Sequence, residues 1–368
     1  MLGLFILFPV FSINAQYYEN TTPVMIGLAI GIYGLTQAIL QIPFGVLSDK
    51  FGRKPILLIG ILFFIIGSII SALATDIMTV VIGRFFQGLG AISSVLMAFV
   101  ADIVREEHRT KANAFIGMQI GIAFMVAILI APIITNQIGI NGLFWFITII
   151  ATIAFLIATT LPKQKIYKQY QFSLQTFKSI LILPLLRLNF SIFVLHFILA
   201  STFISLPLQW VKNNISASQH WHIYLPVMII SFILMVPFII AIEKYKKINL
   251  NFAISIMLVT LSSFMFYQYN TPLISFVFLT LFFTGFNTLE ATIPSLIAKK
   301  ISNNKRGLAM GFNGSSQFLG AFFGGLIGGI IFKNYSLNSV FLANSLLGIC
   351  WLFFILFTQR SKDYGRGK

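Results

Sequence analysis

The chain has 368 residues, of which 58% are hydrophobic and 9% are charged, and its mean hydropathy is +0.92. Soluble domains carry about 25% charged residues, so this composition excludes a water-soluble fold. The single cysteine, Cys350, excludes a disulfide scaffold, a cysteine-based metal site and iron–sulfur chemistry. The four histidines have no metal-ligand spacing. We therefore expect neither an enzyme nor a cofactor.

Twelve apolar runs follow one another along the chain, each long enough to cross a membrane as a helix. They do not alternate polar and apolar residues, as the strands of a membrane barrel would. The expected fold class is an all-α membrane protein with twelve transmembrane helices. The runs are 1–17, 24–47, 55–74, 78–101, 112–135, 142–161, 188–210, 223–242, 250–267, 273–297, 308–332 and 337–357.

Lysine and arginine residues gather in alternate loops between these runs. All but three of the 25 basic residues fall on one side of the membrane; Lys212 and Lys333 fall on the other side, and Arg84 lies inside a run. By the positive-inside rule the basic side is cytoplasmic, so we expect both termini in the cytoplasm. The net charge of +16 is therefore a signal of topology. We expect no nucleic-acid partner, because the basic residues do not form one solvated face.

A basic stretch after the sixth run divides the runs into two sets of six. The expected parts are an N-terminal six-helix bundle at 1–161, a cytoplasmic linker at 162–187, a C-terminal six-helix bundle at 188–358 and a short cytoplasmic tail at 359–368. Within the linker, apolar residues from Phe172 to Leu183 alternate with polar ones and Lys178. This pattern favours an interfacial helix lying on the inner leaflet. The alternative is a disordered tether.

Short patterns recur in the two sets of six at nearly the same offset. A Pro-Phe pair followed by an acidic, a basic and an aromatic residue occurs at 43–51 and again at 237–245, which is 194 residues later. A pattern of Arg, Ala, Phe and Gly occurs at 109–117 and again at 306–314, which is 197 residues later. These recurrences indicate two parallel repeats related by an axis along the membrane normal, as in major facilitator transporters.

The loop between the second and third runs reads Gly-Val-Leu-Ser-Asp-Lys-Phe-Gly-Arg-Lys at 45–54. It resembles the G-x-L-x-D-x-x-G-R-K signature of the major facilitator superfamily. The resemblance implies that the Asp49 carboxylate meets the positive N-terminal end of the eleventh span, near Arg306, when the cytoplasmic side is closed. The alternative is that the basic residues of the loop only set the topology. The residues expected in this cytoplasmic gate are Gly45, Asp49, Gly52, Arg53, Lys54, Arg109, Glu243 and Arg306.

The fourth and fifth runs carry two further signatures. The segment at 84–91 resembles the R-x-x-Q-G-x-G-A signature of proton-driven members. A buried arginine costs about 2.5–3.5 kcal/mol on insertion scales, so Arg84 should face the bundle interior and have a partner. Alternatively, it anchors the helix by reaching the interface. Gly117, Gly121 and Ala131-Pro132 resemble a weakened antiporter signature, which is only faint support for export.

Glu290 is the one carboxylate inside a run, so it is a candidate proton carrier, or alternatively a brace for a neighbouring helix. His196 is expected to be a hydrogen-bonded packing residue rather than a relay. The ladder of Gly320, Gly324 and Gly328 predicts close helix packing. Amide side chains provide polar points that a cavity could use. They are Asn14, Gln37, Gln41, Gln119, Asn287, Asn313 and Gln317.

Three longer stretches, at 26–37, 109–117 and 289–296, resemble the YajR-type branch of the drug/proton antiporters. The resemblance covers nearly the whole chain and implies proton-coupled export across the bacterial inner membrane. Two departures stand out. Only about ten residues follow the last run, whereas that branch has a soluble C-terminal domain. The first run is short and has no basic lead, so we expect either an upstream start or a clipped first span.

The sequence thus predicts a proton antiporter that exports small lipophilic compounds by alternating access. Its expected partners are a small-molecule substrate, protons and membrane lipids, and we expect a monomer. The first alternative is a proton-coupled symporter for a sugar or peptide, which would favour several polar side chains in the spans. The second is a membrane protein that senses or assembles without transporting.

Overall fold

The structure is a computed structural model that describes residues 2–104, 108–162, 178–244, 247–269, 271–301 and 305–363. The first half of the chain forms α1 (Leu2–Phe5), α2 (Phe11–Asn14), the 3-10 helix η1 (Ala15–Tyr17), α3 (Pro23–Phe51), α4 (Arg53–Ala72), α5 (Ile77–Leu89), α6 (Ser93–Ile103) and α7 (Arg109–Thr160). The second half forms α9 (Leu183–Lys212), the 3-10 helix η3 (Ala217–Gln219), α10 (His220–Glu243), α11 (Ile248–Gln268), α12 (Pro272–Lys300), α13 (Arg306–Asn334) and α14 (Leu337–Asp363).

Ten helical segments among the described residues are long and apolar enough to span a membrane. The expected number was twelve, and the difference lies in two places. The 52-residue α7 contains Gly139 with a φ of 72° and a ψ of 179°, so its two arms match the fifth and sixth runs. The first run is divided into α1, a turn, α2 and η1, and none of these pieces is long enough to span alone. The all-helical membrane fold is confirmed.

Helix ends follow local sequence signals. Thr22 precedes α3, and its hydroxyl accepts a bond of 3.3 Å from the amide of Met25, while Pro23 occupies the first helical turn. Gly52 separates α3 from α4 with a φ of 94°, a backbone conformation that favours glycine. The chain therefore turns at Gly52 from α3 directly into α4.

The boundary of the second half differs from the expected one. α9 begins at Leu183 rather than at 188, because Pro184 lies in its first turn, where the missing amide hydrogen costs nothing. Arg187, expected in the linker, lies within α9 and donates to the carbonyls of Ile355 and Thr358 at 3.3 and 3.4 Å. Residues 172–177 of the expected interfacial helix lie outside the described residues, 179–182 are not helical, and Leu183 already belongs to α9.

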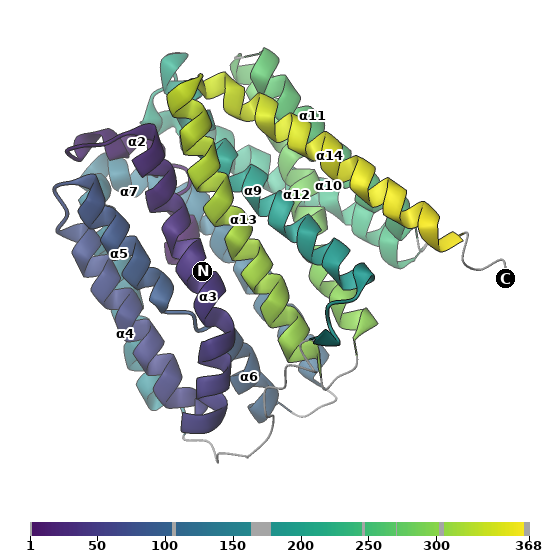
Figure 1. Cartoon of the computed structure of the whole chain (residues 1–368). Helices are drawn as coiled ribbons and strands as arrows, with labels where there is room; N and C mark the ends of the chain where they lie inside the picture. The colour runs from purple at the N-terminus through teal and green to yellow at the C-terminus, as the bar shows by residue number, and fades with distance from the viewer. Residues whose placement is uncertain are drawn as a thin grey trace.

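α13 packs most extensively against α3 and α9, between which it lies (Figure 1). Its glycine ladder faces α9. A Cβ added at Gly320 would lie 2.1 Å from the carbonyl oxygen of Phe193, and one added at Gly324 would lie 2.2 Å from that of Phe197. Only glycine fits at such a distance, so the predicted close packing of this ladder is confirmed.

A second glycine contact joins the two halves of the chain. A Cβ at Gly27 of α3 would lie 2.1 Å from the carbonyl oxygen of Gly325 of α13, and a Cβ at Gly31 would lie 2.7 Å from that of Phe322. Further along the two antiparallel helices, the Ser315 hydroxyl donates to the carbonyl of Ala38 at 3.0 Å. The halves therefore meet directly through the backbones of α3 and α13.

The two ends of the bundle differ in charge. α3 and α12 finish, and α13 begins, at one end of the bundle, toward the lower part of Figure 1. These helix ends carry Lys50, Lys299 and Arg306. We call this the basic end. The glycine contact between α3 and α13 lies toward the other end, where α3 begins and α13 finishes. We call that the opposite end.

Candidate functional site

Three polar side chains from three helices of the second half meet inside the bundle: Glu290 of α12, His196 of α9 and Gln317 of α13. The Gln317 amide nitrogen donates to Glu290 Oε1 at 3.2 Å and lies 2.8 Å from His196 Nε2. His196 Nε2 lies 3.7 Å from the second carboxylate oxygen, Oε2. We call these three residues the polar cluster.

The hydrogen bonds of His196 fix the form of its ring in this arrangement. Nδ1 lies 3.1 Å from the carbonyl oxygen of Ile192, so Nδ1 carries the hydrogen and donates. Nε2 is then the acceptor for the Gln317 amide. The imidazole is therefore neutral, and Gln317 donates to both the histidine and the carboxylate.

Burial differs between the two ionisable groups. The side chain of His196 is 5% exposed, whereas that of Glu290 is 30% exposed. Glu290 Oε2 is itself buried and accepts no hydrogen bond from any residue that the structure describes. A buried carboxylate oxygen without a donor has lost its hydration without replacement, which makes this atom a favourable place for a proton.

Phenylalanines cover the polar cluster on the side of the opposite end. The ring of Phe286, one turn before Glu290, lies 5.5 Å from the His196 ring. Phe124 of α7 lies 5.7 Å from Phe283 and 6.1 Å from Phe286, so the rings come from both halves. Phe203 of α9 lies 6.3 Å from Phe283. This aromatic layer separates the polar cluster from the opposite end.

Arg84 lies inside the first half and is 1% exposed, so it does not reach the interface. Its guanidinium donates to Gln87 Oε1 at 2.6 Å and to the carbonyl of Ala29 at 3.2 Å, and it lies 4.8 Å above the Tyr33 ring. These partners belong to α3 and α5, whereas those of Glu290 belong to α9 and α13. Among the described residues, Arg84 and Glu290 therefore belong to separate networks.

At the basic end, Arg53 ties three helices of the first half together. It forms an ion pair with Asp49 of α3, donates to Asp102 of α6 at 2.9 Å and donates to Ser48 at 2.7 Å. Lys54 donates to the carbonyls of two residues at the end of α7, at 2.6 and 2.7 Å.

The resemblance implies a contact between Asp49 and the start of α13, and no such contact is present among the described residues. The partner of Asp49 within the described chain is Arg53. Arg306 donates to the carbonyl of Ala298 at 3.2 Å, and a Cβ added at Gly307 would have no atom of a described residue within 4 Å. The basic ends of α3 and α13 are therefore apart, while their opposite ends touch.

Of the other residues expected in the gate, Gly45 faces Ser94 of α6, since an added Cβ would lie 3.5 Å from its hydroxyl. Arg109 begins α7 and Glu243 ends α10. The side chains of Arg109 and Glu243 lie outside the described set.

The expected amides scatter over the bundle, and only Gln317 joins the polar cluster. Gln37 donates to the Tyr33 hydroxyl at 3.0 Å and to the Gly90 carbonyl at 3.2 Å, where α5 ends. The remaining five amides have these positions: Gln41 is buried, Gln119 is exposed, Asn14 bonds to the Val10 carbonyl, Asn287 bonds to Ser231, and Asn313 bonds to Asn189.

Sequence reasoning expected His196 to be hydrogen-bonded but did not identify its partners. The ring lies against the Ile192 carbonyl and shares the Gln317 amide with Glu290. A histidine inside an apolar run needs a polar partner in the same way as a carboxylate. The sequence could not say which helices would bring such partners together.

The comparisons with known proteins agree with this geometry. The Major Facilitator Superfamily model matches residues 1–300 and 188–368. The inner membrane transport protein YajR of Escherichia coli K12 is 40% identical over 96% of this chain and 79% of its own length. The multidrug resistance protein MdtH of Blochmanniella floridana is 24% identical over 90% of this chain and 84% of its own.

Among solved structures, that of a D-xylose–proton symporter superposes with a TM-score of 0.75 at 16% identity, covering 96% of this chain and 94% of that one. A likeness at this identity shows the fold. Together with the helical bundle and the family match over the whole length, these findings show that the chain is a multi-pass membrane protein and not an enzyme. The chain belongs to the major facilitator superfamily of transporters.

Proposed function

We propose that the protein is a proton-coupled antiporter that exports small lipophilic compounds across a bacterial inner membrane by alternating access. We place the basic end in the cytoplasm, because loops rich in lysine and arginine are retained there. An inner-membrane relative at 40% identity and a multidrug-resistance relative support the location and the direction. We further propose that the protein works as a monomer.

The polar cluster is the observation that carries proton coupling. An imidazole exchanges protons near neutral pH, and a carboxylate can do so where its surroundings disfavour the charged form. Glu290 and His196 lie 3.7 Å apart and share one amide donor, so they cannot change protonation independently. Glu290 is the proposed proton carrier, because its side chain is 30% exposed, whereas that of His196 is 5% exposed.

Protonation of Glu290 would redistribute these hydrogen bonds. The new hydroxyl is a donor, and it can bond to His196 Nε2 after a shift of less than about 1 Å from the present separation of 3.7 Å. His196 then no longer needs the Gln317 amide. Gln317 belongs to α13, the helix that packs against α3 between the two halves. A proton on Glu290 therefore changes the forces on the helix that joins the halves.

The surroundings of Glu290 indicate the class of substrate. Phe286 of α12 packs against the His196 ring, and rings from α7 and α9 pack against its neighbour Phe283. These rings offer dispersion contacts but no hydrogen bonds. No second carboxylate lies beside Glu290 among the described residues to pair with a dication. We therefore propose neutral or weakly charged lipophilic substrates.

Proton-coupled sugar uptake is the second candidate, favoured by the shared fold with a D-xylose–proton symporter. A sugar needs several hydrogen-bonding side chains around it, because each buried hydroxyl must find a partner. The amides of this chain are instead spread over separate contacts. Export of a lipophilic compound fits the interior better.

Reconstitution tests the proposal. A drug-susceptibility and accumulation screen in a pump-deficient host selects the compound, and proteoliposomes with an imposed pH gradient then measure its movement together with that of protons. Antiport predicts opposite directions for compound and protons. Movement in the same direction would establish symport, and movement without a pH dependence would contradict proton coupling. Glu19→Gln, which neutralises an exposed carboxylate at the opposite end, is the matched control and should transport like the wild type.

A further inference from the structure

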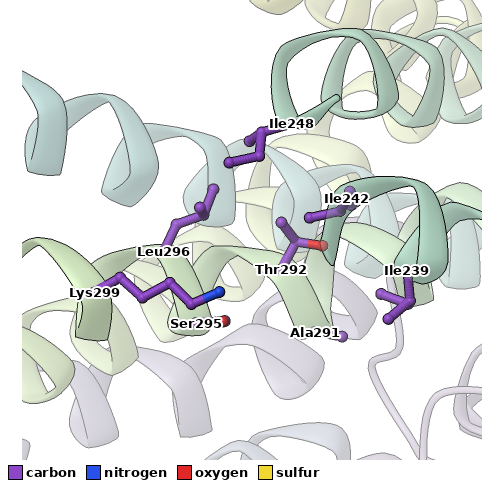
Figure 2. A pocket seen from close by; sticks show the side chains of 8 residues that line it. All are labelled: Ile239, Ile242, Ile248, Ala291, Thr292, Ser295, Leu296 and Lys299. Carbon is purple, nitrogen blue, oxygen red and sulfur yellow. The ribbon is translucent and has the colours of Figure 1, made fainter. Parts of the chain in front are cut away.

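A cleft of about 380 Å³ lies between α10, α11 and α12 near the basic end (Figure 2). It is distinct from the polar cluster, because α12 presents Glu290 to α9 and α13 and presents the following residues to the cleft. Small-molecule sites in proteins have volumes of about 300–1,000 Å³, so the cleft is large enough for a ligand. Its lining residues are Ile239, Ile242, Ile248, Ala291, Thr292, Ser295, Leu296 and Lys299.

The lining is apolar except at one edge. Figure 2 shows the isoleucines of α10 and α11 opposite α12, and the Lys299 side chain turned back along α12 so that its ammonium lies over Ser295. Lys299 forms no ion pair with any acidic side chain that the structure describes. The cleft thus pairs an apolar wall with one uncompensated positive charge, which suits an amphiphile with an anionic head.

The charge around the cleft strengthens this preference. Lys244 and Lys247 lie between α10 and α11, and Lys300 lies beside Lys299 at the end of α12. One acidic residue, Glu243, lies in the same segments. Basic pockets between spanning helices on the cytoplasmic side are typical binding places for acidic lipid headgroups.

The cleft is also open to its surroundings. Ala291 and Ser295 on its α12 side are exposed, so protein does not cover them. On α10, Ile233, Val236 and Ile240 share one face and are 63%, 50% and 47% exposed. Ile239, which lines the cleft, lies about one helical turn after Val236 and next to Ile240. An apolar surface therefore leads from the cleft along α10.

We propose that this cleft binds an anionic phospholipid of the cytoplasmic leaflet, with its phosphate at Lys299 and Ser295 and an acyl chain along Ile239, Ile242 and Ile248. The proposal shares with the proposed function the placement of the basic end in the cytoplasm. It does not depend on proton coupling or on the direction of transport. The bound lipid links the ends of three helices, so it should stabilise their packing at the basic end.

Native mass spectrometry of the purified full chain tests the proposal, with phosphatidylglycerol as the probe and phosphatidylethanolamine as the zwitterionic comparison. We expect retained phosphatidylglycerol on the wild-type protein and at least a five-fold loss of that adduct with Lys299→Gln. Lys333→Gln removes a lysine from the opposite end and is the matched control, which should bind like the wild type. Equal adducts on the wild type and Lys299→Gln would overturn the proposal.

A second variant separates the loss of a charge from the loss of the cleft. Ala291→Trp fills the cleft from its exposed mouth without changing the charge, and it should also abolish the phosphatidylglycerol adduct. Glu290→Gln should leave the adduct unchanged, so failed proton coupling and failed lipid binding are distinguishable. Equal retention of phosphatidylethanolamine, or displacement of the lipid by the transported compound, would show that the occupant is not an anionic phospholipid and would also overturn the proposal.

Discussion

The glycine contact between α3 and α13 makes a sharp prediction about the conformational equilibrium. A Cβ at Gly27 would lie 2.1 Å from the carbonyl oxygen of Gly325, whereas real Cβ atoms essentially never approach a heavy atom within 3.0 Å. Gly27→Ala therefore forces the two backbones apart by at least about 0.9 Å. The contacted atoms of Gly325 and Gly329 belong to the backbone, so they cannot move aside by a change of side-chain rotamer.

The free-energy cost of the added methyl group applies only to the conformation in which α3 and α13 touch at the opposite end. Overpacking a close contact costs about 1–3 kcal/mol. α3 and α13 belong to different halves, so the penalty is relieved when the halves separate at the opposite end. A difference of that size shifts a two-state equilibrium by about 5- to 150-fold. We expect Gly27→Ala to populate a state that is open at the opposite end and to slow transport.

Spin labels measure this shift directly. Thr75→Cys and Lys212→Cys place labels on exposed positions of the first and second halves at the opposite end, in a Cys350→Ser background. Gly27→Ala should lengthen the distance between them. Gly311→Ala, where an added Cβ meets nothing within 4 Å, is the control for the gain in helix propensity. An unchanged distance distribution with normal transport in Gly27→Ala would refute the reasoning.

Three further predictions concern single side chains. Arg84→Met should lower the midpoint of thermal unfolding in detergent, because each lost hydrogen bond of a buried charged group costs about 1.5–3 kcal/mol. An unchanged midpoint would contradict a stabilising role for the buried hydrogen bond between Arg84 and Gln87. Asp49→Asn should insert normally but transport several-fold more slowly in proteoliposomes, and wild-type transport by the well-expressed variant would oppose a gating role. The hydroxyl and amide of Thr79 donate to the Asp76 carboxylate and lower its pKa in the folded protein. The charged carboxylate therefore stabilises the fold fully above the unfolded-state pKa of about 3.9. This stabilisation is lost as the pH falls through the lower pKa of the folded protein. Melting curves should show the advantage of wild type over Asp76→Asn shrinking in that range, and a constant difference would contradict it.

The fold could be predicted from the sequence to a large extent, because membrane helices have strong local signals. Long apolar runs and the placement of lysine and arginine predict the spans, and the spacing of Gly320 and Gly324 predicts close packing. The residue at which a helix starts or is interrupted depends on finer features of the sequence. Pro184 moves the beginning of α9, and the backbone of Gly139 divides α7 without a break in its apolar pattern.

The candidate site was predicted only in part, because its geometry depends on how helices rotate against one another. Glu290 stood out as a carboxylate in an apolar run, but its neighbours His196 and Gln317 come from two other helices, α9 and α13. Asp49 illustrates the opposite case. Its present partner, Arg53, is four residues away and thus visible in the sequence, whereas the implied contact with α13 depends on the conformation.

The central claim is that Glu290 carries the proton that drives export, and Glu290→Gln tests it most directly. The amide keeps the shape of the side chain but cannot take up or release a proton. In proteoliposomes, this variant should lose transport driven by a pH gradient while it keeps exchange of substrate across the membrane without a gradient. Gradient-driven transport at the wild-type level would contradict the account and would shift attention to His196. Equal loss of both activities would instead show that Glu290 braces the bundle.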